Sequence, residues 1–260
     1  MNGVVSSQQW ASVTNRWTRQ DEASAAMHRR VPLRSGRRGG IVDPSDPAYK
    51  GQKDYGPALL TVYDWWVLGF MARMVWRSPT PQIMDWYRPL FGKRHLDIGP
   101  GSGYCIDNGA APDTDLTLLD PNLQVLAHCA KRLARFDPTL VEADVLKPLP
   151  VEGPFDSVAL SFVLHCLPGP MDRKSDAITN AAAVLAPDGV LFGGTVLGVD
   201  EHHTAPARAF IKLASKKGAF DNLGDTREGL ESILHRSFSE VEIDVRGSLA
   251  MFTARNPTNT

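Results

Sequence analysis

The stretch His95-Leu96-Asp97-Ile98-Gly99-Pro100-Gly101-Ser102-Gly103 decides how the middle of this chain folds. A short apolar run with one acidic residue breaks into three glycines at alternate positions, which is typical of a strand that turns into a ligand loop. Glycine allows a positive φ and a close approach of the backbone to a ligand, and the amides of the next helix would face that ligand. The spacing G-x-G-x-G differs from the G-x-G-x-x-G of dinucleotide sites, so the loop suits a bulky ligand without a pyrophosphate.

Downstream of residue 93, apolar runs alternate with amphipathic stretches, which predicts a parallel sheet with helices on both faces. The expected strands are His95–Ile98, Leu116–Leu119, Thr139–Glu142, Ser157–Ser161 and Val190–Thr195. The expected helices are Tyr104–Ala110, Asn122–Arg135, Ser175–Leu185, Ala207–Lys217 and Thr226–His235. The chain closes with two alternating runs around a glycine turn, Val241–Val245 and Ala250–Ala254, which predict a hairpin with an antiparallel final strand.

Two helices are expected before the glycine loop. Between Leu59 and Arg77, apolar residues recur at helical spacing, and a second helix is expected from Thr80, as its N-cap, to about Phe91. We therefore divide the chain into a partly flexible N-terminal extension (1–54), a helical cap over the active site (55–92) and a ligand-binding domain (93–260).

Composition bounds the class of protein. With 43% apolar and 22% charged residues, the chain has the composition of an ordinary globular protein, and it contains no apolar run near the ~20 residues that span a bilayer, so we expect a cytoplasmic location. Residues 1–40 carry seven arginines and two acidic residues, which we interpret as a solvated tail. The remainder is acidic, which argues against nucleic acid as a partner. The three cysteines are widely spaced and no metal-ligand spacing occurs, so neither a disulfide framework nor a metal is expected.

Three carboxylates lie at or next to the carboxyl ends of the first three expected strands, where open parallel sheets bind ligands. Asp120, after the second strand, suits two ribose hydroxyls, and Asp144, after the third, supplies a further carboxylate acceptor at the same edge. The alternative is that each acid caps a turn, and it is strong for Asp120 because Pro121 follows. It is weak for Asp97, because a carboxylate inside an apolar strand needs a partner to offset its desolvation.

The glycine loop and its acid resemble the first motif of class I S-adenosylmethionine (SAM)-dependent methyltransferases. Ser161, His165, Leu167 and Pro168 match the S-x-x-x-H-x-L-P segment after the fourth strand of many small-molecule members. The (N/D)PP(Y/F) tetrapeptide of members that methylate exocyclic amines of bases or glutamine side chains is absent. Val184–Leu191 resembles the turn into the family's fifth strand. The resemblance covers residues 93–260 and implies an α/β, Rossmann-like, seven-stranded and mostly parallel sheet with an antiparallel C-terminal hairpin.

This resemblance also implies the cofactor and its contacts. The cofactor is SAM and the product S-adenosylhomocysteine, with the methionyl amino group at Asp97 and Tyr63 over the methionyl end. The full set of expected cofactor residues is Tyr63, Asp97, Gly99, Pro100, Gly101, Gly103, Asp120, Pro121, Asn122, Asp144, Val145 and Ser161.

The reaction expected is in-line methyl transfer to O, N or C of a small, partly apolar or aromatic acceptor, as in microbial specialised metabolism. His165 is the first candidate for a general base, because a histidine titrates near neutrality and this one follows the fourth strand; equally, it could bond the cofactor or a backbone group. His202, with His203 beside it, is the second candidate.

Other features of the sequence leave alternatives open. The tryptophans at 65, 66, 76 and 86 either pack in the core or form an aromatic wall, and Cys166 is expected to be a packed thiol. A SAM-binding fold could run a non-methylating reaction such as a cyclisation, and a nicotinamide-dependent oxidoreductase is the more remote alternative. The expected partner is a small-molecule acceptor, and a homodimer is considered.

Overall fold

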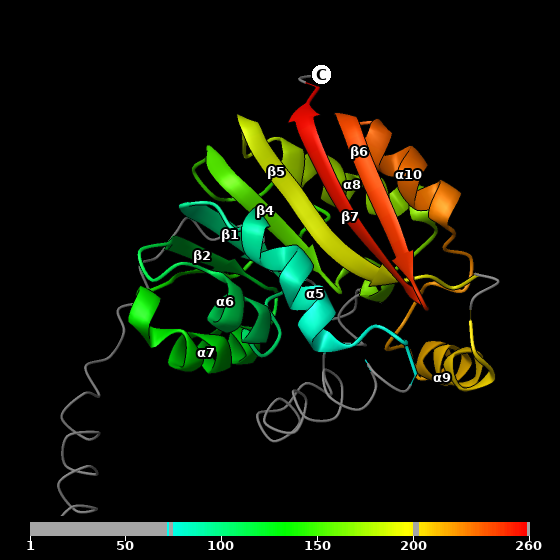
Figure 1. The fold of residues 1–260 in the computed structure, drawn as a ribbon. Coiled ribbons are helices and arrows are strands. Elements are labelled where there is room, and N and C mark those ends of the chain that lie inside the picture. Colours follow the sequence, from blue (N-terminus) through cyan, green and yellow to red (C-terminus); the bar gives the residue numbers. More distant parts are fainter. Residues whose placement is uncertain (1–71, 73–74, 200–202, 259–260) are drawn as a thin grey trace, which may run out of the picture. The chain divides into compact units, whose positions relative to one another are not determined.

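The structure of this chain is a computed structural model, and it describes residues 72, 75–199 and 203–258 (Figure 1). Its centre is a seven-stranded sheet with the order β3-β2-β1-β4-β5-β7-β6. The strands are β1 (Arg94–Ile98), β2 (Asp115–Leu119), β3 (Thr139–Val141), β4 (Phe155–Ser161), β5 (Leu185–Val196), β6 (Phe238–Arg246) and β7 (Leu249–Pro257). Five strands are parallel, and β7 runs antiparallel between β5 and β6 (Figure 1). The predicted Rossmann-like sheet with a C-terminal hairpin is confirmed.

Helices cover both faces of this sheet. The α-helices are α5 (Thr80–Tyr87), α6 (Tyr104–Gly109), α7 (Leu123–Arg132), α8 (Met171–Ala182), α9 (Ala205–Lys216) and α10 (Arg227–His235). The short 3-10 helices are η2 (Arg88–Leu90), η3 (Ala134–Phe136) and η4 (Leu164–Cys166). None of these helices is long and apolar enough to cross a membrane.

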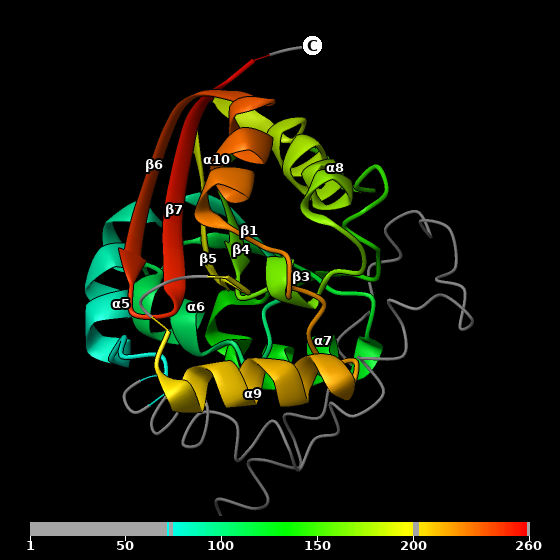
Figure 2. The same ribbon diagram turned by 90° about the vertical axis from the view of Figure 1, so that its right-hand side faces the viewer.

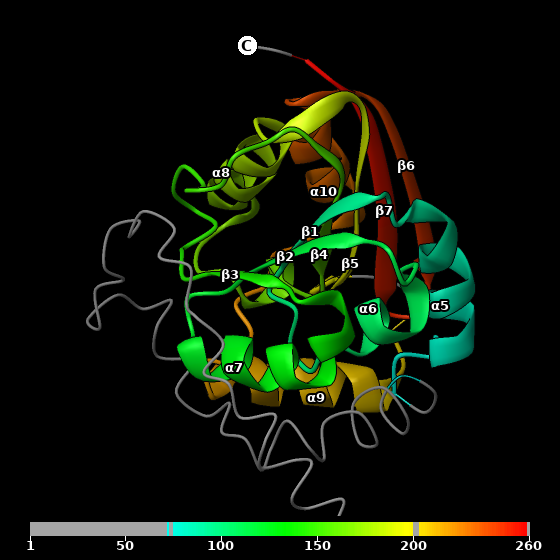
Figure 3. The same ribbon diagram turned by 90° about the vertical axis from the view of Figure 1, so that its left-hand side faces the viewer.

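The alternation of side chains along β1 assigns each helix to a face. Leu96 and Ile98 belong to the core under α8 and α10, together with residues of β4 and β5. His95 and Asp97 point to the other face, where α5, α6 and α7 pack. Figure 2 shows α8 and α10 on one side of the sheet and α5 on the other, and α9 lies beyond the end at which β5 terminates (Figures 2 and 3).

Helix α5 differs from its prediction in position and in bounds. Thr80 is the first helical residue rather than the N-cap, and the α-helix stops at Tyr87, four residues early. Tyr87 is fully buried, with its ring centroid 5.3 Å from that of Phe192 on β5, and Ile83 joins the same cluster. The apolar stripe of this helix therefore packs on the sheet, and the division of the chain into an extension, a helical cap and a ligand-binding domain stays a prediction.

Strand β5 begins at Leu185, five residues before its prediction, and α8 starts at Met171, four residues early. Leu185 pairs with Phe155, and the register shifts between Phe155 and Ser157. The pair Asp188-Gly189 therefore lies at an irregularity inside a strand, where local sequence rules indicate a turn. The predicted elements from residue 94 onward are otherwise present, with ends shifted by a few residues.

Candidate functional site

The candidate site is formed by the short segments that directly follow the parallel strands, at the carboxyl edge of the sheet. The strand order reverses between β1 and β4, because β2 and β3 follow β1 on one side while β4 and β5 lie on the other. Ligands of open α/β sheets bind at such a switch point. The glycine loop follows β1 there, and η4 follows β4.

The glycine loop combines packed positions with one open position. Gly99, Gly101 and Gly103 have φ of 68°, 56° and 76°, values that a side chain rarely adopts. A Cβ on Gly103 would lie 2.7 Å from Cys129 Sγ, whereas a Cβ on Gly101 would meet nothing within 4 Å. The loop is thus pressed against the protein at Gly103 and faces open space at Gly101, with Pro100 partly buried between Gly99 and Gly101.

Asp97 is a buried carboxylate with one oxygen that has no partner. The residue is 2% exposed, and its Oδ1 accepts no hydrogen bond from the residues described, while Oδ2 lies 3.6 Å from Nε2 of His95. Burial raises the pKa of this carboxyl group, and His95 opposes the rise. An unpaired buried acceptor beside a glycine loop fits a cationic ligand group such as an ammonium.

Asp120 and Asp144 lie in the loops after β2 and β3, and each makes a turn contact. Asp120 Oδ1 accepts from the amide of Asn122 at 2.7 Å, and Asp144 Oδ1 accepts from that of Leu146 at 3.0 Å. The capping role considered from the sequence is thus present in both, and each bond occupies one carboxylate oxygen. Burial raises the pKa of Asp120 to about 7.

Pro121, Asn122 and Val145 are the neighbours of these two acids. Asn122 is the N-cap of α7, and its Oδ1 accepts from the amide of Gln124 at 2.9 Å. Val145 is buried and Pro121 is partly exposed. The turns that hold the two carboxylates therefore also fix these residues at the same edge.

His165 lies in η4 with its ring almost wholly buried. Its Nδ1 accepts a hydrogen bond from the amide of Val196 at 3.2 Å and lies 3.4 Å from Oγ1 of Thr195. Burial, together with the charge of Lys174, lowers the pKa of His165 to about 3. Of the two roles considered from the sequence, the bond to a backbone group is present. Ser161, at the end of β4, has a buried Oγ without a partner among the residues described.

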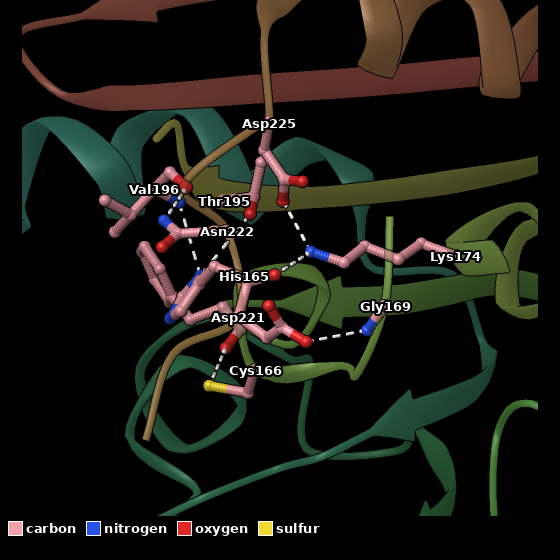
Figure 4. A network of polar contacts seen from close by, with 10 residues as sticks. His165, Cys166, Gly169, Lys174, Thr195, Val196, Asp221, Asn222 and Asp225 are labelled. Atoms are coloured by element: carbon pink, nitrogen blue, oxygen red, sulfur yellow. Dashed lines mark hydrogen bonds and ion pairs between the residues drawn. The ribbon is translucent and has the colours of Figure 1, made fainter. Parts of the chain in front are cut away.

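A buried ion pair holds the segment that covers His165 (Figure 4). Lys174 of α8 is fully buried, and its Nζ donates to Asp225 Oδ2 at 2.6 Å and to the carbonyl oxygen of Asp221 at 2.7 Å. The amide of Asp221 donates to the carbonyl oxygen of His165 at 2.8 Å. Lys174 was not predicted as a site residue from the sequence, although a lysine on the same helical stripe as Ala177, Ile178 and Ala181 indicates a buried charge that needs a partner.

Aromatic rings extend from His165 along the α9 side of the site. The centroid of His165 lies 4.4 Å from that of Phe220, which lies 6.1 Å from Phe210, and Phe210 lies 5.4 Å from Trp76. Phe162, at φ 64°, lies 6.5 Å from His165 on the other side. Phe162, Phe210 and Phe220 are each partly exposed. Trp86 instead contacts Tyr87 on α5, at 5.5 Å.

Several predicted residues lie elsewhere or outside the description. Tyr63, His202 and the tryptophans at 65 and 66 fall outside the described residues. His203 is buried, with Nδ1 2.9 Å from Oγ of Ser248 at the tip of the final hairpin. Cys166 was expected to be a packed thiol; the residue is exposed, while its Sγ lies 3.9 Å from the carbonyl oxygen of Phe162 and burial raises the pKa of the thiol. Within residues 72, 75–199 and 203–258, no cluster of three metal-ligating side chains occurs.

The sequence and the fold both resemble those of known proteins. Residues 96–191 match the family described as "Methyltransferase domain". The chain is 38% identical over 207 residues to demethylluteothin O-methyltransferase of Streptomyces thioluteus, with 78% of this chain and 90% of the relative covered. It is 37% identical over 215 residues to the physcion biosynthesis cluster O-methyltransferase of Aspergillus chevalieri, with 81% and 97% covered.

A solved structure with a similar fold is the N-methyltransferase NodS of Bradyrhizobium japonicum WM9, in complex with S-adenosylhomocysteine. The TM-score is 0.53 at 19% identity, and the match covers 69% of this chain and 88% of that one. At this identity the likeness concerns the fold alone.

Proposed function

Because this chain belongs to the class I SAM-dependent methyltransferases that act on small molecules, we propose that its acceptor is partly apolar or aromatic and is methylated at O, N or C. The two curated relatives are named as O-methyltransferases, which makes a hydroxyl the first acceptor group to test. The observation that carries the proposed site is Oδ1 of Asp97, which has no hydrogen-bond partner among the described residues and is buried beside the glycine loop at the switch point of the sheet.

SAM supplies a methyl group on a positively charged sulfur, which an acceptor nucleophile attacks in line. In our proposal, Asp97 Oδ1 binds the methionyl ammonium, and the backbone at Gly99, Pro100, Gly101 and Gly103 lies along the cofactor. Asp120 binds the ribose hydroxyls with its remaining oxygen, and Asp144 binds the adenine amino group. The remaining proposed contacts are Pro121, Asn122, Val145, Ser161 and, from the sequence alone, Tyr63.

His165 is proposed to position the acceptor, and its role as general base stays a prediction. The amide of Val196 occupies Nδ1, so the neutral ring carries its proton on Nε2 and offers a donor there. A pKa of about 3 also makes the ring a weak proton acceptor at neutral pH. His202 stays a second candidate from the sequence.

The acceptor is proposed to lie against the partly exposed rings of Phe162, Phe210 and Phe220. Phe210 lies on α9 and Phe220 follows this helix, and the ring centroids of Phe220 and Phe162 lie 4.4 Å and 6.5 Å from that of His165. Ligand sites are lined mainly by apolar and aromatic side chains with a few polar groups. A planar acceptor would thus bury apolar area on the phenylalanines and present one polar group to Nε2 of His165.

Calorimetric titration with S-adenosylhomocysteine tests the cofactor site. Asp97→Ala should weaken binding by about 10- to 150-fold, the equivalent of ~1.5 to 3 kcal/mol for a hydrogen bond to a charged group. The matched control is Asp115→Ala, which removes a carboxylate that is 71% exposed at the opposite end of β2, and its affinity should equal that of the parent. Unchanged affinity in a folded Asp97→Ala variant would remove Asp97 from the site.

Two further measurements separate the rival reactions. Tritium from methyl-labelled SAM should appear in an organic-soluble product from a phenolic acceptor, whereas a cyclisation would leave the label on SAM. NAD should give no heat in the same titration, and micromolar binding would favour the oxidoreductase. The cytoplasmic location and the homodimer stay predictions, to be tested by cell fractionation and by light scattering.

A further inference from the structure

Three buried polar side chains lie on the sheet face under α5 and α6, and the proposed reaction uses only one of them. His95 on β1 and Ser157 on β4 are both fully buried, and they are paired directly across the two strands. Asp97 follows His95 by two residues and so points to the same face. We call these three side chains the Ser157–His95–Asp97 column. Ser157 and His95 lie side by side, and Asp97 lies next to them, closer to the carboxyl edge of the sheet where the proposed cofactor site is.

The contacts of Ser157 are compatible with a tautomer of His95 that presents an N–H to Asp97. Ser157 Oγ accepts from the amide of Gly92 at 2.8 Å and keeps its own proton for a further bond. Nδ1 of His95 lies 2.7 Å from this oxygen. When the hydroxyl donates to Nδ1, the neutral ring has its proton on Nε2, which lies 3.6 Å from Oδ2 of Asp97.

Aromatic neighbours keep the ring of His95 in this orientation. Phe91 packs edge-on at 4.8 Å between ring centroids, and Phe192 stacks at 5.8 Å with 23° between the planes. Neither Nε2 of His95 nor Oδ1 of Asp97 has a hydrogen-bond partner among the described residues. The polar atom of Asp97 beside Nε2 of His95 is Oδ2, at 3.6 Å, a distance too long for a hydrogen bond but short enough for an electrostatic interaction in a buried site.

We propose that His95 is a positioning residue for the cofactor: its Nε2–H, 3.6 Å from Oδ2 of Asp97, stabilises the ionised carboxylate electrostatically and leaves Oδ1 for the methionyl ammonium of SAM. This inference rests on the proposed role of Asp97. The N–H dipole favours the ionised carboxylate, which is the form that binds a cation. His95 itself touches neither cofactor nor acceptor, and it acts only through Asp97.

Other titratable groups interact with Asp97 from the neighbouring elements, and they bear on a pH profile. They are Tyr87 of α5, Cys129 of α7 and Asp120 after β2, and Cys105 of α6 interacts in turn with Tyr87. Burial raises the pKa of the Tyr87 hydroxyl and of the Cys129 thiol, so both stay neutral near pH 7. Asp120 is therefore a second group whose charge can change there, and the pH profile needs the Asp120→Asn variant as its reference.

A matched pair of variants tests the proposal. His95→Gln keeps an N–H near the position of Nε2, and His95→Asn keeps a polar group near Nδ1 for Ser157 but removes the donor toward Asp97. We expect His95→Asn to weaken binding of S-adenosylhomocysteine by about tenfold or more and to raise the KM for SAM, while kcat at saturating SAM stays within about twofold. His95→Gln should restore the affinity to within about threefold of the parent.

A double-mutant cycle with Asp97→Asn separates this proposal from the proposed cofactor site. In the Asp97→Asn background, His95→Asn should cost nothing further, because its effect passes through the carboxylate. If Asp97→Asn alone leaves the affinity unchanged, the proposed ammonium site fails. If Asp97→Asn weakens binding but His95→Asn does not, or the two losses multiply, the proposal for His95 is overturned and the site stands.

Ser157→Ala covers the case in which His95→Asn fails to fold. This variant removes the hydroxyl that bonds Nδ1, so the ring is no longer held with its N–H at Nε2 toward Asp97. Affinity for S-adenosylhomocysteine should fall by about threefold or more. Parental affinity in the folded Ser157→Ala protein would overturn the proposal.

Discussion

Removing the ammonium group of Lys174 should lower the melting temperature (Tm) of this protein substantially. In the substitution Lys174→Met, the stem of the side chain is kept and the charge is lost. Asp225 then keeps a carboxylate whose side chain is 3% exposed and whose counter-charge at 2.6 Å is gone, and the carbonyl of Asp221 loses its donor. Breaking a buried ion pair on one side costs about 3 to 5 kcal/mol, because an uncompensated charge remains inside.

The magnitude converts into a change in Tm that calorimetry can measure. For a chain of this size, 1 kcal/mol corresponds to about 2 to 4 °C, so Lys174→Met should lower Tm by about 6 to 20 °C. The exposed pair Arg227–Glu231 provides the control, because both side chains are more than 40% exposed. Arg227→Met should cost at most ~1 kcal/mol, or up to about 4 °C.

A second variant separates loss of charge from loss of packing. Lys174→Met combined with Asp225→Leu removes both charges, and it should recover most of the lost Tm. The backbone carbonyl of Asp225 still accepts from the amides of Gly198 and Val199 in that protein. A Tm for Lys174→Met within 2 °C of the parent, or a double variant as unstable as the single one, would refute this reasoning.

The contacts of Lys174 with Asp221 and Asp225 should influence binding of the acceptor more than binding of the cofactor. Lys174 fixes the segment that contains Phe220 and Asp221, and this segment covers His165. At a temperature where Lys174→Met is folded, we expect the KM for a phenolic acceptor to rise by about tenfold, while affinity for S-adenosylhomocysteine stays within about threefold. Equal losses for both ligands would show that the network does not act on the acceptor side.

Four other predictions address the edge of the sheet and the N-terminal segments. Affinity for S-adenosylhomocysteine should rise between pH 6 and 8 in the parent, and less so in Asp120→Asn. A pKa of about 7 leaves Asp120 largely protonated at pH 6, and only the ionised carboxylate accepts from both ribose hydroxyls. A parental affinity that does not change with pH would contradict this. Gly103→Ala should lower Tm by several degrees because its Cβ would meet Cys129, whereas Gly101→Ala should chiefly weaken cofactor binding, and thermal shift with and without ligand separates the two. Because the pKa of His165 lies near 3, its titration should not shape the dependence of kcat/KM on pH between 5 and 8, and His165→Gln should leave the shape of that profile unchanged. If His165→Gln instead removes a limb of the profile and lowers the rate by ~100-fold, His165 acts as the general base. Tyr63→Ala should reduce turnover or cofactor affinity by about tenfold, while deletion of residues 1–45 should leave the affinity within a few-fold, and the reverse result would place the arginine-rich segment at the active site.

The sequence by itself determined the order of the elements and the residues at the strand ends. Alternation of apolar and polar residues is set by geometry along a single strand, and glycine readily adopts the positive φ that the loop after β1 takes at residues 99, 101 and 103. Asp97 was separable from Asp120 and Asp144 for a local reason, since only Asp97 lies inside an apolar strand. Its unpaired Oδ1 is consistent with that distinction, and its contact with the cofactor stays a prediction.

Only the tertiary structure decided which distant residues meet. Lys174 and Asp225 are 51 positions apart, and His165 and Val196 are 31 apart, so no local pattern indicates that one neutralises or orients the other. The packing of α5 on Phe192 and the early start of β5 at Leu185 were likewise decided by partners far along the chain. Burial, protonation and orientation of a side chain depend on the groups packed around it, and those groups come together only when the sheet has formed.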